Sequence, residues 1–172
     1  MKPVLFVYAS KTGVTRDAAQ EAAAQLGKEA AFFDCRTHRL TPPDGVPLKS
    51  NPALGEYAAV ILGTVMYMGS PLKEMKRFCA AHEAELLSLP VAIFTCGLET
   101  AETDERYLRS HLPAALIQHA LIYRHLGGEA RFEQMNAFER MAMREFEKQR
   151  GKAAGINANM VRELCAAVTQ YI

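Results

Sequence analysis

Short runs of consecutive apolar residues recur along the chain, and longer stretches with a helical spacing of apolar positions separate them. Apolar runs without alternation are typical of strands that are buried on both faces, as in a parallel sheet. The predicted strands are residues 4–8, 30–33, 58–62, 90–95 and, with the weakest pattern, 121–126. The hydrophobic pattern therefore favours a parallel sheet at the centre of the protein.

The stretches between these runs place apolar residues three or four positions apart, on one face of a helix. Gly27 is a suitable C-cap for the first helix, and Ser70-Pro71 is typical of an N-cap followed by the first helical position. Pro113 divides the helical stretch 102–120. The predicted buried faces are Val14, Ala18, Ala22 and Leu26; Leu72, Met75, Phe78, Cys79 and Leu86; and Val161, Leu164, Cys165 and Val168.

Strands and helices alternate along the chain, which predicts an α/β protein with a three-layer sandwich architecture. The segment 41–52 is the exception, because it contains four prolines and little periodicity. We interpret it as an irregular connection where a second crossover helix would normally lie. A length of 172 residues fits a single domain that spans residues 1–172.

One predicted helix follows the fifth strand and is additional to the helices that the alternation of strands and helices requires. Asn136, with Glu139 three positions later, suits a capping box at its start. The apolar residues on one face of this helix are Phe138, Met141, Ala142 and Phe146. The helix lies in an insertion at about 129–152. We expect it to pack on the domain; a lid over a ligand, or a contact with a partner or a membrane surface, stays open.

The composition is that of an ordinary globular protein, with 49% hydrophobic residues, 23% charged residues and a formal net charge of +1. A nearly neutral chain has no strong attraction to nucleic acid. The sequence shows neither a signal-peptide pattern nor an apolar run of the roughly 18–20 residues that span a bilayer. We therefore expect a cytoplasmic protein with no nucleic-acid partner and no transmembrane segment; peripheral membrane contact stays open.

The four cysteines and five histidines form no recognisable metal or redox motif. No cysteines are paired as C-x-x-C, and their spacing resembles no zinc site. A phosphatase loop that began at Cys96 would need arginine at position 102, where the chain has Glu102. We expect buried, reduced thiols, ordinary histidines and no metal site.

The first strand ends in the sequence S-K-T-G-V-T, residues 10–15, directly before the first helix. Free backbone N–H groups at a helix N-terminus bind anions, and glycine lets the backbone approach closely. A turn with a simple N-cap would need one hydroxyl, but this loop has three, and it is neither a Walker loop nor G-x-G-x-x-G. The loop therefore predicts a phosphate site. Its residues are Ser10, Thr12, Gly13, Val14 and Thr15, with Lys11 at the rim.

The chain as a whole resembles the flavodoxin-like FMN-binding family. S-K-T-G-V-T after V-L-F-V-Y-A is similar to the [ST]-x-T-G-x-T loop of flavodoxins, which holds the phosphate of FMN. The resemblance implies FMN as the cofactor and a five-stranded parallel sheet of order 2-1-3-4-5. The segment L-G-G-E-A-R-F-E-Q-M-N-A-F-E-R resembles a flavodoxin-domain subgroup that includes the menaquinone-dependent protoporphyrinogen oxidases, which carry a long insertion near this end of the domain.

The resemblance also implies that two further loops hold the flavin ring. The second loop, 63–71, would contact the ring through Thr64, Val65, Met66, Tyr67 and Gly69. Tyr67 either stacks on the ring or packs in the core, and Gly63 and Gly69 suit a backbone beside a flat ring. The third loop, 95–100, would contact the other side through Thr95, Cys96, Gly97 and Leu98. It lacks the aromatic and acidic cluster of ordinary flavodoxins, so we expect one face of the ring to be open to a substrate.

Two redox functions and one non-redox function fit these features. The first is an FMN-dependent oxidoreductase that acts on a quinone, a porphyrinogen or another small organic acceptor. The second is an electron carrier with a redox-protein partner, and the third is a binder of a phosphorylated ligand without redox chemistry. Electron-shuttle flavodoxins are strongly acidic, whereas this chain is nearly neutral, which favours the enzyme. No acid, base or other catalytic residue is evident, and neither is the oligomeric state.

Overall fold

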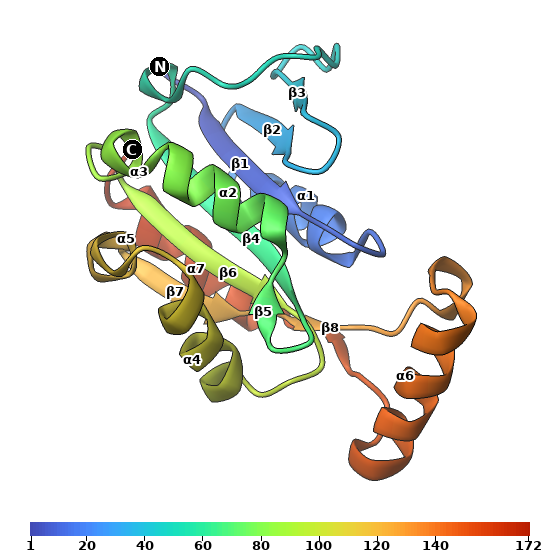
Figure 1. The fold of residues 1–172 in the computed structure, drawn as a ribbon. Coiled ribbons are helices and arrows are strands. Elements are labelled where there is room, and N and C mark those ends of the chain that lie inside the picture. The colour runs from blue at the N-terminus through green and yellow to red at the C-terminus, as the bar shows by residue number, and fades with distance from the viewer.

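Five parallel strands form the centre of the protein in a computed structural model that describes residues 1–172 (Figure 1). Each strand contains one of the apolar runs, and the residues of β1, β4 and β6 at the sheet centre are almost all buried on both faces. The strands are β1 (Val4–Ala9), β2 (Ala30–Asp34), β4 (Ala59–Tyr67), β6 (Val91–Cys96) and β7 (Ile122–His125).

The sheet has seven strands, so the prediction of a five-stranded, purely parallel sheet was incomplete. Its order is β3-β2-β1-β4-β6-β7, and β5 pairs with β4. The two added strands, β3 (Arg39–Thr41) and β5 (Ser70–Pro71), are both antiparallel to their neighbours. Strands this short carry too few residues to show an alternating pattern, which is why the hydrophobic pattern did not reveal them.

The stretch Ser70-Pro71 is a strand rather than the predicted helix start. β4 continues past its predicted end to Tyr67, and the chain reverses at Met68 and Gly69, whose φ angles are 49° and 77°. Two residues with positive φ suit the two-residue turn of a β-hairpin. The helix begins later, as α2 (Lys73–Ala81), and a break at His82 separates it from α3 (Glu83–Leu86).

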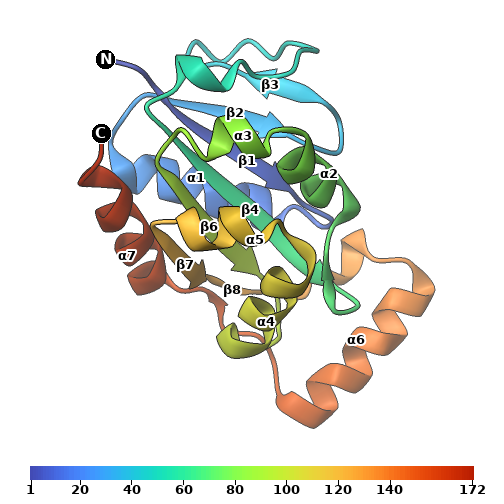
Figure 2. The ribbon, with the colours of Figure 1, turned by 60° about the vertical axis from the view of Figure 1, so that its left-hand side comes forward.

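Helices cover both faces of the sheet and create two hydrophobic cores (Figure 2). α1 (Val14–Leu26) and α7 (Ala158–Thr169) pack on one face. The other face is covered by α2, α3, α4 (Ala101–His111) and α5 (Ala114–His119), with Pro113 directly before α5 as its N-cap. The short 3-10 turns are η1 (Leu54–Glu56) and η2 (Phe132–Gln134).

The insertion after β7 projects beyond the carboxyl ends of the strands (Figure 1). It leaves and rejoins the domain through the short antiparallel pair β8 (Gly127–Gly128) and β9 (Gly155–Ile156). Its helix α6 (Ala137–Arg150) begins at the predicted capping box of Asn136 and Glu139 but has no buried residue. The expectation that its apolar face packs on the domain was wrong, because Phe138 and Met141 are 66% and 63% exposed.

None of the helices combines the length and the apolar character that a membrane span requires.

Candidate functional site

The carboxyl ends of four parallel strands meet in one row at an edge of the sheet. Ala9 of β1 is paired with Thr64 of β4, Thr64 with Thr95 of β6, and Thr95 with His125 of β7. All three predicted cofactor loops lie at this edge or just beyond it. Ligands of open parallel sheets bind at such an edge, so the fold brings the predicted site residues to one place.

The first loop, residues 10–15, presents unpaired backbone donors where it enters the N-terminus of α1. The first hydrogen bond of the helix runs from the Asp17 N–H to the Gly13 carbonyl at 3.0 Å. Gly13 has a φ of 91°, in the left-handed region that favours glycine, and turns the chain into the helix. Such a concave group of donors is suited to an anion. The N–H groups without an acceptor in the protein are those of Lys11, Thr12, Val14, Thr15 and Arg16.

The hydroxyl groups of this loop differ in their partners. Ser10 Oγ accepts a hydrogen bond from the Gly13 N–H at 3.0 Å and so supports the turn. Thr15 is only 1% exposed, and its Oγ1 lies beside the Cys96 thiol without forming a hydrogen bond of regular geometry. A buried hydroxyl without a partner costs stability, and Thr15 does not line the cavity over the loop, so a ligand oxygen would reach this hydroxyl only if the loop moved. Thr12 is half-buried and does line that cavity.

The second loop is mostly strand, and only its tip is accessible. Thr64 is 1% exposed, and its hydroxyl donates to the Val65 carbonyl and accepts from the Leu72 N–H. Gly63 has a packing role, because a Cβ at this position would collide with the Phe94 ring. This explains Gly63 without the flat ring that we expected beside it.

Tyr67 and Lys11 form the tip of the site where the first and second loops meet. Tyr67 is 37% exposed, and Lys11 Nζ lies 3.3 Å from the centre of its ring. A cation at this position is attracted by the electrons of the ring face. One face of Tyr67 is therefore occupied by Lys11, and a stacked ligand would need the other face or a displaced Lys11.

The third loop begins with buried side chains and ends with free donors. Thr95 and Cys96 are 0% and 1% exposed, so neither side chain faces the loop surface. Burial raises the pKa of the Cys96 thiol to about 12, which keeps it protonated. The Gly97 N–H donates to the Gly127 carbonyl at 3.0 Å, whereas the N–H groups beyond it at 98 and 99 have no acceptor in the protein.

The glycine pair after β7 packs against the backbone of the third loop. A Cβ on Gly128 would come within 2.6 Å of the Gly97 carbonyl oxygen, so only glycine allows the two backbones to lie this close. Gly127 has a φ of 87° and crosses the backbone of Gly155. The Gly-Gly segment, to which the sequence assigned no chemistry, therefore holds the third loop in place.

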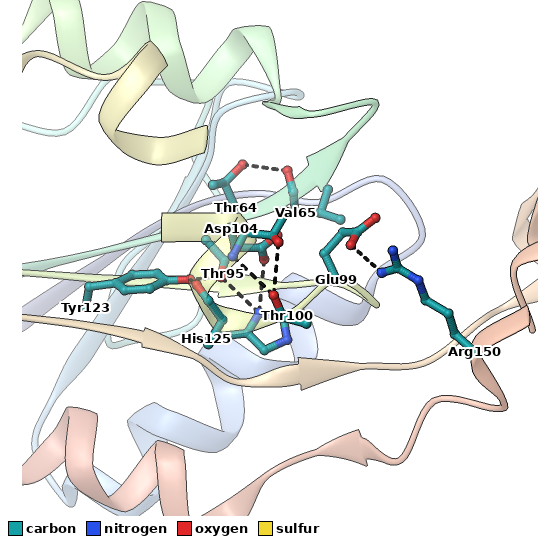
Figure 3. Close-up of polar contacts among 11 residues, drawn as sticks. Thr64, Val65, Thr95, Glu99, Thr100, Asp104, Tyr123, His125 and Arg150 are labelled. Carbon is teal, nitrogen blue, oxygen red and sulfur yellow. Dashed lines mark hydrogen bonds and ion pairs between the residues drawn. The ribbon is translucent and has the colours of Figure 1, made fainter. Parts of the chain in front are cut away.

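A buried polar network lies behind the third loop, and sequence reasoning missed it (Figure 3). Asp104 is 0% exposed, and its Oδ2 lies 3.0 Å from Nδ1 of His125. The same Nδ1 lies 3.2 Å from Thr95 Oγ1, which is 2.9 Å from the Tyr123 hydroxyl. The available signal was the place of His125 at the carboxyl end of a strand. Asp104 had no signal, because it resembles any other acidic residue near a helix N-terminus.

His125 also lines a cavity of about 270 Å³ between the third loop and the end of the insertion. Its Nε2 makes no hydrogen bond in the protein, while Nδ1 is oriented by Asp104. An imidazole that is held at one nitrogen and free at the other is able to accept or donate a proton. The cavity also contains Glu99, Arg150 and Lys152.

The insertion is attached to all three loops by charged side chains. Glu139 of α6 forms an ion pair with Lys11, and its Oε1 is 3.3 Å from the Tyr67 hydroxyl. Arg150 at the end of α6 lies 2.6 Å from Glu99 of the third loop (Figure 3). A third contact, from Arg131 to Asp17, measures 2.8 Å. The sequence indicated the helix but none of these contacts, because they join segments that are far apart in the chain.

Comparisons with solved structures identify the same fold in several flavoproteins. A Fusobacterium nucleatum flavodoxin, solved with flavin mononucleotide bound, is 13% identical over 99% of this chain and 96% of that chain, with a TM-score of 0.52. Flavodoxin 1 from Bacillus cereus is 14% identical over 99% of both chains, with a TM-score of 0.51. A WrbA-like flavodoxin from Agrobacterium tumefaciens is 20% identical over 95% of this chain and 99% of that chain, with a TM-score of 0.50.

No curated protein matches the chain. The structural likenesses are all at low sequence identity and establish the fold alone. A match at the level of the family is more extensive, since the family described as Flavodoxin domain matches residues 5–155. With the sheet, the first loop and this match in agreement, the chain belongs to the flavodoxin domain family.

Proposed function

We propose that the protein binds FMN and transfers electrons through it. The observation that carries this proposal is the group of unpaired backbone donors in the first loop, together with the Thr12 hydroxyl beside the cavity over this loop. Both fit a phosphate group, which offers several acceptor oxygens and a negative charge to the positive end of α1. FMN is bound by the Fusobacterium nucleatum relative of the same fold. When bound, FMN supplies one-electron or two-electron transfer.

The flavin ring would lie between the tips of the second and third loops. Tyr67 and Gly69 are accessible on one side, with Val65 and Met66 half-buried beneath them. On the other side, the free N–H groups of Leu98 and Glu99 would serve the polar edge of the ring. Thr64, Thr95 and Cys96 are buried under the loops, so we assign them a supporting place under the ring rather than direct contact. Gly97 would shape the loop, because its own N–H is already used.

We favour a small organic or quinone-type electron acceptor over a role as a simple electron carrier. The nearly neutral charge of the chain would not steer it toward a basic protein partner. The His125–Asp104 pair beside a cavity of about 270 Å³ offers a proton-transfer group close to the third loop. A carrier of electrons alone has no need of such a group. Protoporphyrinogen oxidase activity rests only on the resemblance of the segment after β7, and it requires its own assay.

The cofactor assignment is tested by removing two hydroxyls from the first loop. We expect Thr12→Ala combined with Thr15→Ala to weaken FMN binding by about 2–4 kcal/mol, because two donors to a charged group are lost. Flavin fluorescence titration of the flavin-free protein measures this loss. An unchanged affinity would refute the phosphate assignment, and a protein that binds no FMN at all would refute the function.

Measurements of catalytic turnover distinguish an enzyme from an electron carrier. Flavin absorption bands that bleach with dithionite would support both redox functions. Steady oxidation of NAD(P)H or another donor with a soluble quinone would then support the enzyme. Electron exchange only with a redox protein would support the carrier instead.

A further inference from the structure

Arg131 of the insertion lies on the first loop, 119 positions away in the sequence from Thr12. Its Nη1 donates to the Thr12 carbonyl at 3.4 Å and lies 2.8 Å from Asp17 Oδ2. A Cβ on Gly13 would stand 2.9 Å from the same nitrogen. The guanidinium therefore lies directly against the turn that opens α1, beside the unpaired donors.

The guanidinium is held there by carboxylates of the protein. Nε and Nη2 of Arg131 each lie 2.5 Å from Glu129 Oε1, while Nη1 is paired with Asp17. Asp17 is also bonded to Nε of the adjacent Arg16 at 2.9 Å. Arg131 thus has two anionic partners, and one of them, Asp17, already has a second cation.

The cavity over the first loop has a volume of about 460 Å³ and is lined almost entirely by polar residues. A phosphate group that entered it would meet the carboxylate of Asp17 next to the helix N-terminus. The Asp17 side chain is 39% exposed, so water can solvate it once it leaves Arg131. The charged side chains of the cavity are Lys11, Arg16 and Arg131, opposed by Asp17, Asp34 and Glu133.

We propose that Arg131 is a phosphate-binding residue that exchanges its contact with Asp17 for one with the phosphate of FMN. This inference rests on the proposed binding of FMN. Nη1, which this exchange frees, would donate to a phosphate oxygen while Nε and Nη2 stay on Glu129, so the guanidinium remains oriented in a way that a lysine ammonium would not be. The free N–H groups and the Thr12 hydroxyl complete the phosphate contacts from the side of the loop.

The exchange links the insertion to the cofactor. Arg131 precedes η2 and α6, so a phosphate held by Arg131 joins the insertion to the first loop more strongly than the exposed pair with Asp17 does. The same contact makes Arg131 specific for FMN over riboflavin, which has the same ring but no phosphate. Arg131 is therefore a specificity-determining residue as well as an anchor of the insertion.

The test measures the dissociation constants of FMN and riboflavin separately, by fluorescence titration of the flavin-free full-length chain. We expect Arg131→Ala to weaken the binding of FMN about 10- to 100-fold, which is the range of a lost charge-assisted hydrogen bond. The binding of riboflavin should be unchanged. Arg131→Lys should retain part of the FMN affinity. Asp17→Asn should strengthen the binding of FMN, because it removes the carboxylate that competes with the phosphate for Arg131.

Arg144→Ala is the matched control on α6, since this arginine lies by the Phe132 ring and outside the cavity of the first loop. It should change neither constant. The ratio of the dissociation constants of FMN and riboflavin is compared between Arg131→Ala and the natural protein. An unchanged ratio would overturn the inference and leave the proposed function standing. Failure of the natural protein to bind FMN would instead refute the proposed function. If Arg131→Ala does not fold, a failure of Asp17→Asn to raise FMN affinity overturns the inference.

Discussion

The helices α1 and α6 both begin beside the candidate cofactor site, yet they are held in opposite ways. α1 buries a face of small residues between the sheet and α7, and Ala18, Ala19 and Ala22 are each 0% exposed. α6 has no buried residue, and its contacts with the three loops come from Glu139 and Arg150. The burial of apolar area is worth more than exposed ion pairs. The comparison indicates that α1 belongs to the stable framework, whereas α6 is held mainly by polar contacts.

The largest effect that tests this comparison is on global stability. We expect Ala22→Leu in α1 to lower the free energy of unfolding by about 1–3 kcal/mol, because a larger side chain does not fit between the helix and the sheet. Ala142→Leu makes the same change on the exposed surface of α6 and should alter the free energy by less than about 0.5 kcal/mol. Urea denaturation monitored by circular dichroism measures both. Equal losses in the two variants would show that α6 is as much a part of the core as α1.

A smaller effect distinguishes ligand binding from stability within α1 itself. We expect Thr15→Val to raise the free energy of unfolding of the flavin-free protein by about 1 kcal/mol, because a buried hydroxyl without a partner is removed. The same variant should bind FMN more weakly than the natural protein does. Thermal unfolding without flavin and fluorescence titration with FMN measure the two changes. Loss of stability without flavin would mean that the Thr15 hydroxyl serves the framework.

The smallest effect is a pH dependence of the attachment of α6. The ion pair with Lys11, and the bond from the Asn136 backbone, lower the pKa of Glu139. A carboxyl group with a lowered pKa in the folded state stabilises that state above its ordinary pKa, and this stabilisation is lost as the pH falls through the lowered value. The protection factors of the α6 amides, which correct for the slower intrinsic exchange in acid, should therefore fall before the amides of α1 lose protection. Glu145→Gln, on the exposed side of α6, serves as the control and should preserve this response. If Glu139→Gln also preserved it, the ion pair would not be its source.

The core of the fold was predictable from the sequence because it depends on local patterns. The apolar runs that became β1, β2, β4, β6 and β7 are continuous, and such runs have few stable alternatives to a buried parallel sheet. The first loop was equally predictable, since its hydroxyls and Gly13 are close together in the chain. The strands β3 and β5 were missed because strands of two or three residues carry no pattern.

The candidate site was predictable only in part. Tyr67 and Leu98 lie on loops beyond the carboxyl ends of the strands, whereas the burial of Thr95 and Cys96 depends on how the loop after β6 folds back. His125 and Asp104 meet only because α4 packs beside β7, which no spacing in the sequence expresses. The same holds for Arg131, which reaches the first loop from the insertion after β7.

The sequence by itself determined the alternation of strands and helices, the glycine turn at residues 10–15 that opens α1 and the capping box of α6. Each of these depends on residues within a few positions of one another, where backbone preferences and side-chain spacing decide the structure. The tertiary structure alone decided that Arg131 contacts Asp17, that His125 is oriented by Asp104, and that the apolar face of α6 stays exposed. Contacts between distant segments follow from the packing of whole elements, and the local pattern carries no information about which charged side chain will meet which.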